Sequence, residues 1–219
     1  KCIGDNAYGQ LGYGSAGGQQ FANGQMVMTS GSVPLTDVVN LKAGGNHFCA
    51  VTSIGDLYCW GDSAGGQCGA GSGTVNSASL TASAANLGGF GVYDFALGAQ
   101  HTCVATQADA VYCWGDNVAG QLGAATPATT GTPVLITTFA PAITSITTIA
   151  AGGNGTCVVD AGDVRCWGDA THSGTGSAVI AASATALTVG TLSTGEATDV
   201  AVGPTNVCVI GDPGANIGA

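Results

Sequence analysis

HFCAVTSIGDLYCWGD (47–62), HTCVATQADAVYCWGD (101–116) and GTCVVDAGDVRCWGD (155–169) are three copies of one pattern. In each copy, a cysteine in a short apolar run is followed nine or ten residues later by a second cysteine, directly before Trp-Gly-Asp. The second cysteines, with Cys2 as the first of them, recur at spacings of 57, 54 and 53 residues. A period of this length with several strands per unit indicates a propeller or a solenoid.

A fourth copy is divided between the two ends of the chain. KCIGDNAYGQLG (1–12) has the form of the second half of the pattern, and NVCVIGD (206–212) has the form of the first half. This alignment pairs Cys2 with Cys208 and predicts that the two ends meet each other or the ends of a neighbouring molecule. Because there is no initiator Met and no signal peptide, we expect a processed form or a fragment.

The composition predicts an all-β fold. Hydrophobic residues make up 45% of the 219 residues and charged residues only 7%, and there are 38 glycines. Strong helix formers such as Lys, Arg and Glu are scarce, whereas Thr, Val and Ile favour short strands. In the third unit we expect strands at 133–139, 144–153, 156–160 and 164–168. Four antiparallel strands per unit are typical of a propeller blade.

The strand count predicts a single domain of four blades. The repeats run over about 3–59, 60–113, 114–166 and 167–212, with an N-terminal strand at 1–5. The fourth blade is expected to be shared: residues 187–212 supply three strands and residues 1–5 supply the fourth.

The charge balance excludes two classes of partner. The net charge is −10, and the three cationic side chains are Lys1, Lys42 and Arg165. Nucleic acids and anionic membrane surfaces are bound through several Lys or Arg side chains, so we expect neither. No apolar run reaches the roughly 18 residues of a membrane span.

Eight of the nine cysteines fall in the repeated register. This predicts disulfides Cys49–Cys59, Cys103–Cys113 and Cys157–Cys166 on neighbouring strands, and hence an oxidising, extracellular location. The alternatives are reduced core cysteines or a metal site. Zinc sites use closely spaced CxxC-type pairs, which are absent, and no CxxCH haem motif occurs. We therefore expect no metal and no cofactor.

The motif Trp114-Gly115-Asp116-Asn117, followed by Gly-Gln-Leu-Gly (120–123), carries a family resemblance. It resembles the regulator of chromosome condensation repeat, a blade of propellers that usually close with seven. The extra cysteines are similar to those of bacterial extracellular members. A secreted relative that inhibits β-lactamases implies that this fold can serve as a pure protein binder. The acidic charge and the small number of blades argue against the exchange activity of the nuclear member.

Several single residues are candidates for particular roles. Trp60, Trp114 and Trp167 follow the second cysteines and are expected to pack between blades. Cys68 stands where Leu occurs in the equivalent turns, so it is either a buried apolar residue or a free thiol available for crosslinking. Asn154 begins an Asn-Gly-Thr glycosylation sequon.

No catalytic constellation is evident. His47 and His101 occupy equivalent repeat positions, which favours a packing role over catalysis. His172 has no evident partner, and Glu196, the single Glu, has no neighbouring carboxylate in sequence. The Asp residues after Trp-Gly or Ile-Gly recur once per unit, which favours turn formation over calcium binding.

These observations predict a secreted, non-enzymatic structural or interaction protein. Blades of a seven-fold ring turn by about 50° each and those of a four-fold ring by about 90°, so four family-type blades close poorly alone. We expect copies of the chain to join through the divided copy, as a ring or a head-to-tail fibre. The alternative is a closed monomer that binds an extracellular protein or a glycan. A lyase or glycosidase is a third and weaker hypothesis.

Overall fold

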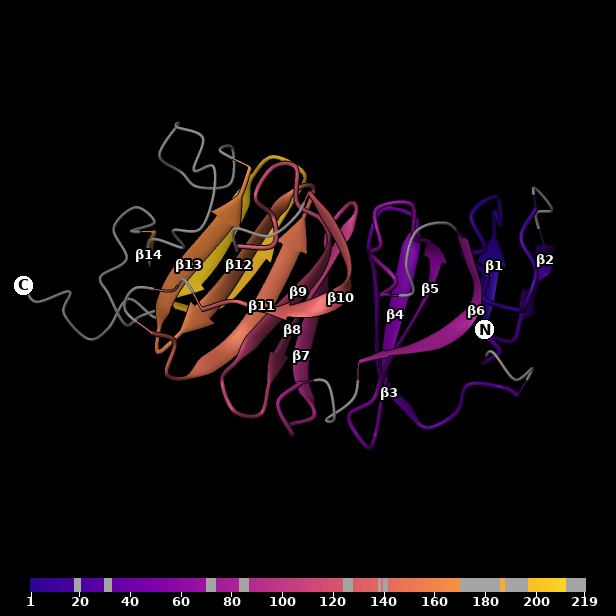
Figure 1. Ribbon diagram of the computed structural model, residues 1–219, viewed down its shortest axis with the longest axis horizontal. Helices are drawn as coiled ribbons and strands as arrows, with labels where there is room; N and C mark the ends of the chain where they lie inside the picture. Colours follow the sequence, from indigo (N-terminus) through magenta and orange to yellow (C-terminus); the bar gives the residue numbers. More distant parts are fainter. Residues whose placement is uncertain are drawn as a thin grey trace, which may run out of the picture.

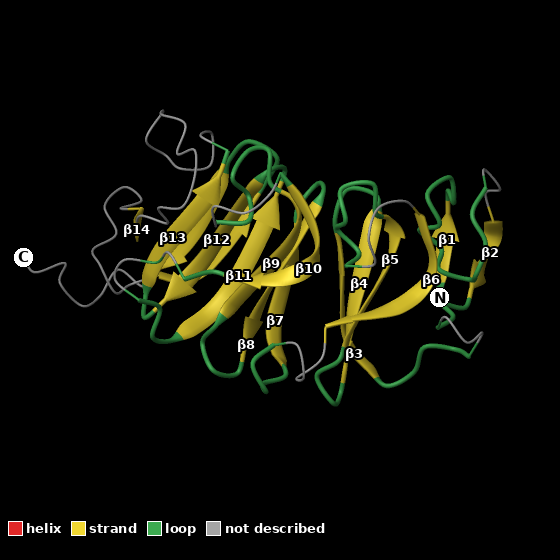
Figure 2. Cartoon of the chain, in the orientation of Figure 1, coloured by secondary structure: helices red, strands yellow, loops and turns green. Residues whose placement is uncertain are grey.

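The computed structural model describes residues 1–17, 21–29, 33–69, 74–82, 87–123, 128–137, 139, 142–169, 186–187 and 197–211. These residues form sixteen β-strands (Figures 1 and 2). The strands are β1 (Cys2–Gly4), β2 (Phe21–Gln25), β3 (Val38–Ala43), β4 (His47–Thr52), β5 (Leu57–Asp62), β6 (Thr74–Ala82), β7 (Val92–Leu97), β8 (His101–Thr106), β9 (Val111–Asp116), β10 (Thr129–Leu135), β11 (Ile146–Gly152), β12 (Gly155–Asp160), β13 (Asp163–Gly168), β14 (Ala186–Leu187), β15 (Ala197–Val202) and β16 (Val207–Gly211).

The strands form antiparallel sheets that follow the chain order. Three sheets have four strands each, β3–β6, β7–β10 and β11–β14, and we call them the first, second and third blade. Two further sheets have two strands each: β1–β2, the N-terminal pair, and β15–β16, the C-terminal pair. The predicted all-β class is confirmed. In the part of the chain that the structure describes, no helix has the length and apolarity that a membrane crossing needs.

In each unit, the structure places one strand in a different sheet from the one that the sequence predicted. Residues 187–212 were expected to supply three strands of the fourth blade, but Leu187 pairs with Val164, and Ala186 with Arg165, on the third blade. β2 likewise pairs with β1. The segment after each Trp-Gly-Asp turn folds back onto the outer edge of the cysteine hairpin, as β6 and β10 also do. Of the three strands expected in 187–212, β14 therefore lies on the third blade, and β15 and β16 form a sheet of two strands.

Each cysteine hairpin is joined by a disulfide. The cysteines lie directly opposite one another in the β4–β5, β8–β9 and β12–β13 ladders. The bonded pairs are Cys49–Cys59, Cys103–Cys113 and Cys157–Cys166, each with a Cα–Cα distance of 4.1 Å. So short a distance is typical of non-hydrogen-bonded positions in an antiparallel ladder, where side chains approach most closely.

The apolar core lies between neighbouring sheets. From the second blade on, the first strand of a sheet packs on the first two strands of the sheet before it: β7 on β3 and β4, β11 on β7 and β8, and β15 on β11 and β12. The residues in these layers are Cys49 and Val51 with Val92 and Phe95, Cys103 and Ala105 with Ile146 and Ile149, and Cys157 and Val159 with Ala197 and Val200.

The N-terminal and C-terminal pairs pack against different blades, the first and the third. In Figure 1, β1 and β2 lie at the right. The N-terminal pair adjoins the first blade, where Cys2 packs near Ala50 and Trp60. The C-terminal pair, yellow in Figure 1, lies against the third blade. The two pairs are therefore separated by the three blades within one chain.

Removal of one disulfide should destabilise its blade. Cys103→Ser combined with Cys113→Ser frees a loop with a sequence separation of 10 residues. Chain-entropy reasoning gives a cost of roughly 2–3 kcal/mol. Urea unfolding monitored by tryptophan fluorescence should show a lower midpoint than the wild type, and the wild type in reductant serves as the control. An unchanged midpoint would contradict a stabilising role for this bond.

Candidate functional site

A glutamine closes the turn that follows Gly-Asp in three of the four units, at Gln10, Gln67 and Gln121. Gln67 Oε1 accepts a hydrogen bond from Gly65 N at 2.8 Å, and Gln121 Oε1 accepts one from Ala119 N at 2.8 Å. The preceding aspartates also accept turn amides: Ala64 N donates to Asp62 Oδ1. The side chains thus fix the turn and leave the glutamine main-chain carbonyls available to the next blade.

The three tryptophans join successive sheets. Each indole donates from Nε1 to the main-chain carbonyl of the glutamine in the preceding turn. The pairs are Trp60 with Gln10 at 3.0 Å, Trp114 with Gln67 at 3.0 Å and Trp167 with Gln121 at 2.9 Å. All three tryptophans are buried, so each indole lies in the interface between its own sheet and the one before it.

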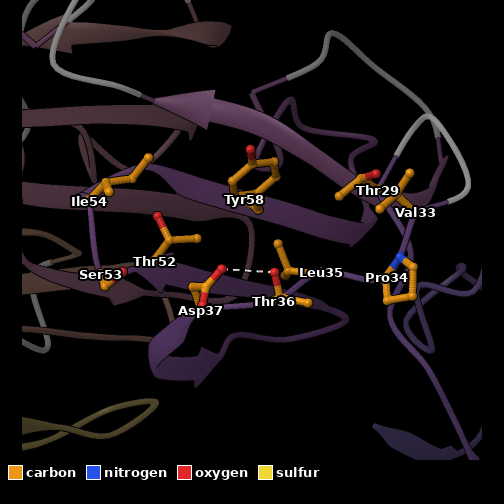
Figure 3. Close-up of a pocket in the computed structure, with 10 residues that line it drawn as sticks. All are labelled: Thr29, Val33, Pro34, Leu35, Thr36, Asp37, Thr52, Ser53, Ile54 and Tyr58. Carbon is orange, nitrogen blue, oxygen red and sulfur yellow. Dashed lines mark hydrogen bonds between the residues drawn. The ribbon is translucent and has the colours of Figure 1, made fainter.

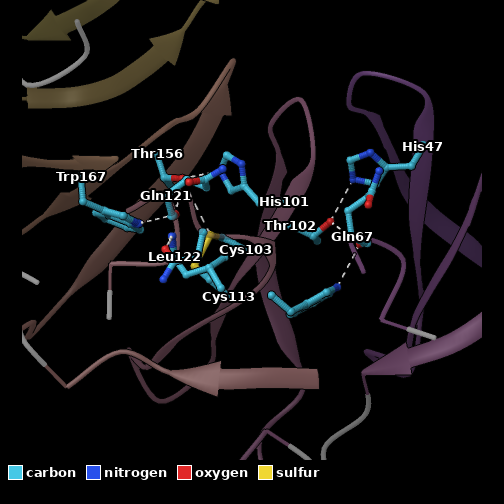
Figure 4. Close-up of a disulfide and its surroundings, with 12 residues drawn as sticks. His47, Gln67, His101, Thr102, Cys103, Cys113, Gln121, Leu122, Thr156 and Trp167 are labelled. Atoms are coloured by element: carbon cyan, nitrogen blue, oxygen red, sulfur yellow. Dashed lines mark hydrogen bonds between the residues drawn. A yellow bond between two sulfur atoms is a disulfide. The ribbon is translucent and has the colours of Figure 1, made fainter. Parts of the chain in front are cut away.

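The repeated histidines belong to the same interfaces (Figure 4). His47 Nε2 lies 3.0 Å from Thr102 Oγ1, and the Thr102 hydroxyl donates to Gln67 O at 2.9 Å. His47 therefore donates from Nε2 and carries its proton there. The arrangement recurs one blade later, where His101 Nε2 lies 2.7 Å from Thr156 Oγ1. Thr102 and Thr156 were not among the candidate residues predicted from the sequence.

The environment of His47 favours the neutral imidazole. The side chain is fully buried, and burial lowers its pKa from 6.5 to about 4. A glycine lies against each of the two histidine rings: a Cβ at Gly44 would collide with the His47 ring and one at Gly98 with the His101 ring. This enclosed, solvent-free setting suits packing between blades, and it gives a substrate no access to the ring.

The other candidate residues lie apart from one another. The Cys68 thiol is fully buried and donates to Asp62 O at 3.2 Å, and burial raises its pKa to about 12. It occupies the place of the apolar Leu122 in the next turn. Asn154 lies half-buried in the turn between β11 and β12, and its glycosylation remains a prediction. His172 and Glu196 lie outside the described residues.

The two end pairs carry the unbonded cysteines of the repeated register. Cys2 is half-buried on β1 and Cys208 is exposed on β16, and neither takes part in a disulfide within the chain. Burial raises the pKa of the Cys2 thiol, against the opposing effect of the N-terminal charge. Ile3, at the position of the buried tryptophans, is 68% exposed. The two ends thus expose residues whose counterparts are buried in the blades.

Two of the three cationic side chains form ion pairs. Lys42 Nζ lies 2.6 Å from Asp94 Oδ1, between the first strands of the first and second blades. Arg165 Nη2 lies 2.7 Å from the buried Asp160 Oδ2 in the third blade. Neither pair was predicted. Among the described residues, no group of three or more His, Cys, Asp or Glu side chains could hold a metal ion.

A hollow of about 290 Å³ lies at one end of the first blade (Figure 3). Its lining includes Tyr58, Thr52 and Asp37, and the Thr36 hydroxyl donates to Asp37 Oδ2 at 2.9 Å. The mixture of an aromatic ring with hydroxyl and carboxylate groups could accept a small polar ligand.

Comparison with known families supports this architecture. Models described as "Regulator of chromosome condensation (RCC1) repeat" match residues 38–67 and 92–121, and residues 109–159. These parts of the chain therefore match the regulator of chromosome condensation repeat. These RCC1 repeats coincide with the cysteine hairpins and the glutamine turns described above.

RCC1-repeat relatives include much longer proteins. The chain is 36% identical over 121 residues to the probable E3 ubiquitin-protein ligase HERC6 of Homo sapiens, which is 55% of this chain and 11% of the ligase. It is 27% identical over 163 residues to the mitochondrial RCC1 domain-containing protein RUG3 of Arabidopsis thaliana, or 74% of this chain and 36% of that protein. The chain therefore spans a minor part of each relative.

Solved structures show the same fold. Human WBSCR16 matches with a TM-score of 0.78 at 20% identity, over 95% of this chain and 53% of that one. Yeast RCC1 (Prp20) bound to Kap60 matches with a TM-score of 0.70 at 19% identity, over 93% and 47%. The chain spans about half of each structure. The predicted resemblance to RCC1-repeat propellers is confirmed.

His47 should make stability depend on pH. An unfolded histidine titrates near 6.5, whereas the folded group titrates at about 4. As the pH falls from about 6.5 to 4, the unfolded state takes up this proton first, so stability is lost by up to about 3 kcal/mol. His47→Asn introduces the residue of the aligned position 206. Urea unfolding at pH 7 and 4.5 should show a smaller acid loss in this variant, and equal losses would refute the assignment.

The hydroxyl of Thr102 should be essential to its interface. Thr102→Val keeps the shape but leaves His47 Nε2 without its acceptor, which costs about 1–3 kcal/mol. Thr102→Ser retains the hydroxyl and is the matched control. Thermal unfolding should place the valine variant well below the serine variant, and similar values would rule out the bridging role.

Proposed function

We propose that this chain is a non-enzymatic interaction protein of an oxidising, extracellular compartment that assembles with copies of itself. RCC1-repeat propellers act as protein-binding folds, as the complex of yeast RCC1 with Kap60 illustrates. Three disulfides fit an oxidising compartment. The two histidines that contact a threonine hydroxyl are enclosed between blades, which favours binding over catalysis.

One observation supports the proposal of self-assembly: the registers of the two end pairs correspond to those of the first two and the last two strands of a blade. β15 and β16 pair as the first two strands of a blade do, because Ala201 lies opposite Cys208 as Ala96 lies opposite Cys103. β1 and β2 pair as the last two strands do. Joined in the order β15–β16–β1–β2, they make one four-stranded sheet with Cys208 opposite Cys2.

The N-terminal pair packs against the first blade and the C-terminal pair against the third, which favours joining between chains. The C-terminal pair of one copy adds to the free edge of β1 in the next copy. This is strand addition, in which main-chain hydrogen bonds supply affinity. The Cys208–Cys2 disulfide then fixes the joint. Two chains can close as a ring of eight blades, within the known range of four to eight, and more chains can form a fibre.

A second candidate function rests on the hollow beside Tyr58 (Figure 3). A glycan could place a sugar face on the Tyr58 ring and its hydroxyls on Asp37. Titration with oligosaccharides, followed by the fluorescence of wild type and Tyr58→Ala, tests this candidate.

Non-reducing electrophoresis and native mass spectrometry test the assembly. Dimers or ladders are expected, which collapse to the 219-residue monomer on reduction. Cys2→Ser and Cys208→Ser should each abolish the covalent species, because the bond joins unlike cysteines. Cys68→Ala is the control and should leave the ladder intact. Dimers that survive Cys2→Ser, or a monomer with Cys2 linked to its own Cys208, would contradict the proposal.

A further inference from the structure

A hollow of about 200 Å³, which we call the slot, lies between the second blade and the segment that leads into the third. One wall is the end of the β8–β9 turn with Asp109 and Ala110, and the other is the segment with Phe139 and Ile143. The second and third blades each have four strands. The slot is therefore bounded on both sides by the chain itself.

The base of the slot is apolar and buried. Val111 and Ile136 line it and are at most 5% exposed, and Ile136 N donates to Val111 O at 2.9 Å. Phe139 packs edge-on against the buried Trp167, with 5.4 Å between the ring centroids. Leu135 also lines the slot and is 43% exposed. The core thus fixes the base, while the rim is open to solvent.

The size and the lining of the slot suit one apolar side chain. Pockets that bind small molecules measure roughly 300–1,000 Å³ and bury most of the ligand. The slot, at about 200 Å³, is smaller, and it accommodates a single side chain such as that of Leu or Phe. Protein interfaces commonly depend on a few such side chains that fill pockets on the partner. The slot therefore fits an anchor residue of another protein better than a free small molecule.

One carboxylate stands at the edge of the slot. Asp109 has a φ of 56°, in the left-handed region that favours glycine, and Gly55 occupies the corresponding place in the first blade with a φ of 86°. Asp109 Oδ1 accepts a hydrogen bond from Ile146 N at 2.7 Å, which ties the turn to the start of β11. Its Oδ2 has no donor among the residues that the structure describes. This oxygen is therefore available to a cation of a partner.

The surroundings of Asp109 are acidic. Asp56 and Asp163 stand at the place of Ala110 in the hairpin turns of the first and third blades. Two of the three cationic side chains are engaged in the ion pairs described above, and the described lining of the slot includes none. A negative potential at this end of the sheets attracts a cationic partner.

We propose that the slot is an anchor site for a protein partner, which inserts one bulky apolar side chain and places a neighbouring Lys or Arg against Asp109. The inference rests on the proposed role of the chain as an interaction protein and gives the chemistry of one partner. Burial of the apolar side chain supplies affinity, and the ion pair with Asp109 selects a basic segment. Self-assembly through β16 and β1 uses no residue of the slot, so one molecule can make both contacts.

Selection from a library of random heptapeptides displayed on phage tests this chemistry. The target is the Cys2→Ser/Cys208→Ser chain, in which the intermolecular disulfide cannot form. Ala110→Leu fills the slot and serves for counter-selection. Ala108→Leu is the matched control, because Ala108 is exposed in the same turn outside the slot and Ile54 occupies its place in the first blade. Peptides that bind the target and the control but not Ala110→Leu should carry a bulky apolar residue next to Lys or Arg. If no such peptide is enriched, or if the enriched peptides are acidic, the inference is overturned.

Calorimetric titration with a selected peptide tests the role of Asp109. Asp109→Asn keeps an acceptor for Ile146 N and suits the left-handed backbone, but it removes the charge. The affinity should fall about fivefold, and binding to the unsubstituted target should weaken with added salt. Asp56→Asn changes the net charge equally in the first blade and should leave the affinity unchanged. Circular dichroism and the unfolding midpoint show that each variant is folded. Equal affinities of Asp109→Asn and Asp56→Asn would refute the ion pair and with it the inference.

The slot and the self-assembly can fail separately. A wild-type chain that stays monomeric but yields basic, apolar peptides would refute self-assembly and support the slot. Disulfide-linked dimers or ladders without such peptides would support self-assembly and refute the slot. If Ala110→Leu abolished the dimers of the wild-type chain while Ala108→Leu did not, the occupant would be a second copy, which would also overturn the inference.

Discussion

The main-chain carbonyl of the turn glutamine is the point on which each blade interface depends. It accepts the indole N–H of the next sheet, and at Gln67 it also accepts the Thr102 hydroxyl. Both donors are buried, so the loss of this acceptor would leave them unsatisfied. The glutamine side chain, bonded to the turn amides, holds that carbonyl in position. Local turn chemistry therefore determines how one blade is placed on another.

The same dependence explains why histidine recurs without a catalytic role. The imidazole of His47 reaches from one sheet to Thr102 of the next, and it does so as a neutral donor because burial disfavours its charged form. Its ring fills space that Gly44 leaves open. A side chain at this repeat position contacts the next blade and not solvent. It is therefore unsuited to substrate binding.

The hairpins and the repeating unit could be predicted from the sequence. The cysteine pattern marks the two strands of each hairpin, and the spacing of the cysteines gives the length of one unit. The tryptophan positions were predictable because a large apolar side chain at a constant register must be buried. The outer strands were misallocated because the pattern has no marker for them: the segments 129–135 and 186–187 share no motif, and only their pairing reveals their sheet. Thr102 and Thr156 were missed because a threonine in a β-strand is common, and its partner lies 35 residues away.

The departures from the repeat gather at the proposed joint. Ile3 stands where the other units have tryptophan, and it has no side-chain donor for a turn carbonyl. If β1 joined the C-terminal pair of another copy, Ile3 would face the segment that follows Trp167-Gly168-Asp169 of that copy, and the sequence HSGTG (172–176) in this segment lacks the glutamine. The indole donor and the glutamine motif would thus both be missing from the proposed joint. The β16–β1 ladder and the Cys2–Cys208 bond would have to hold it instead, and both could form after the separate chains have folded.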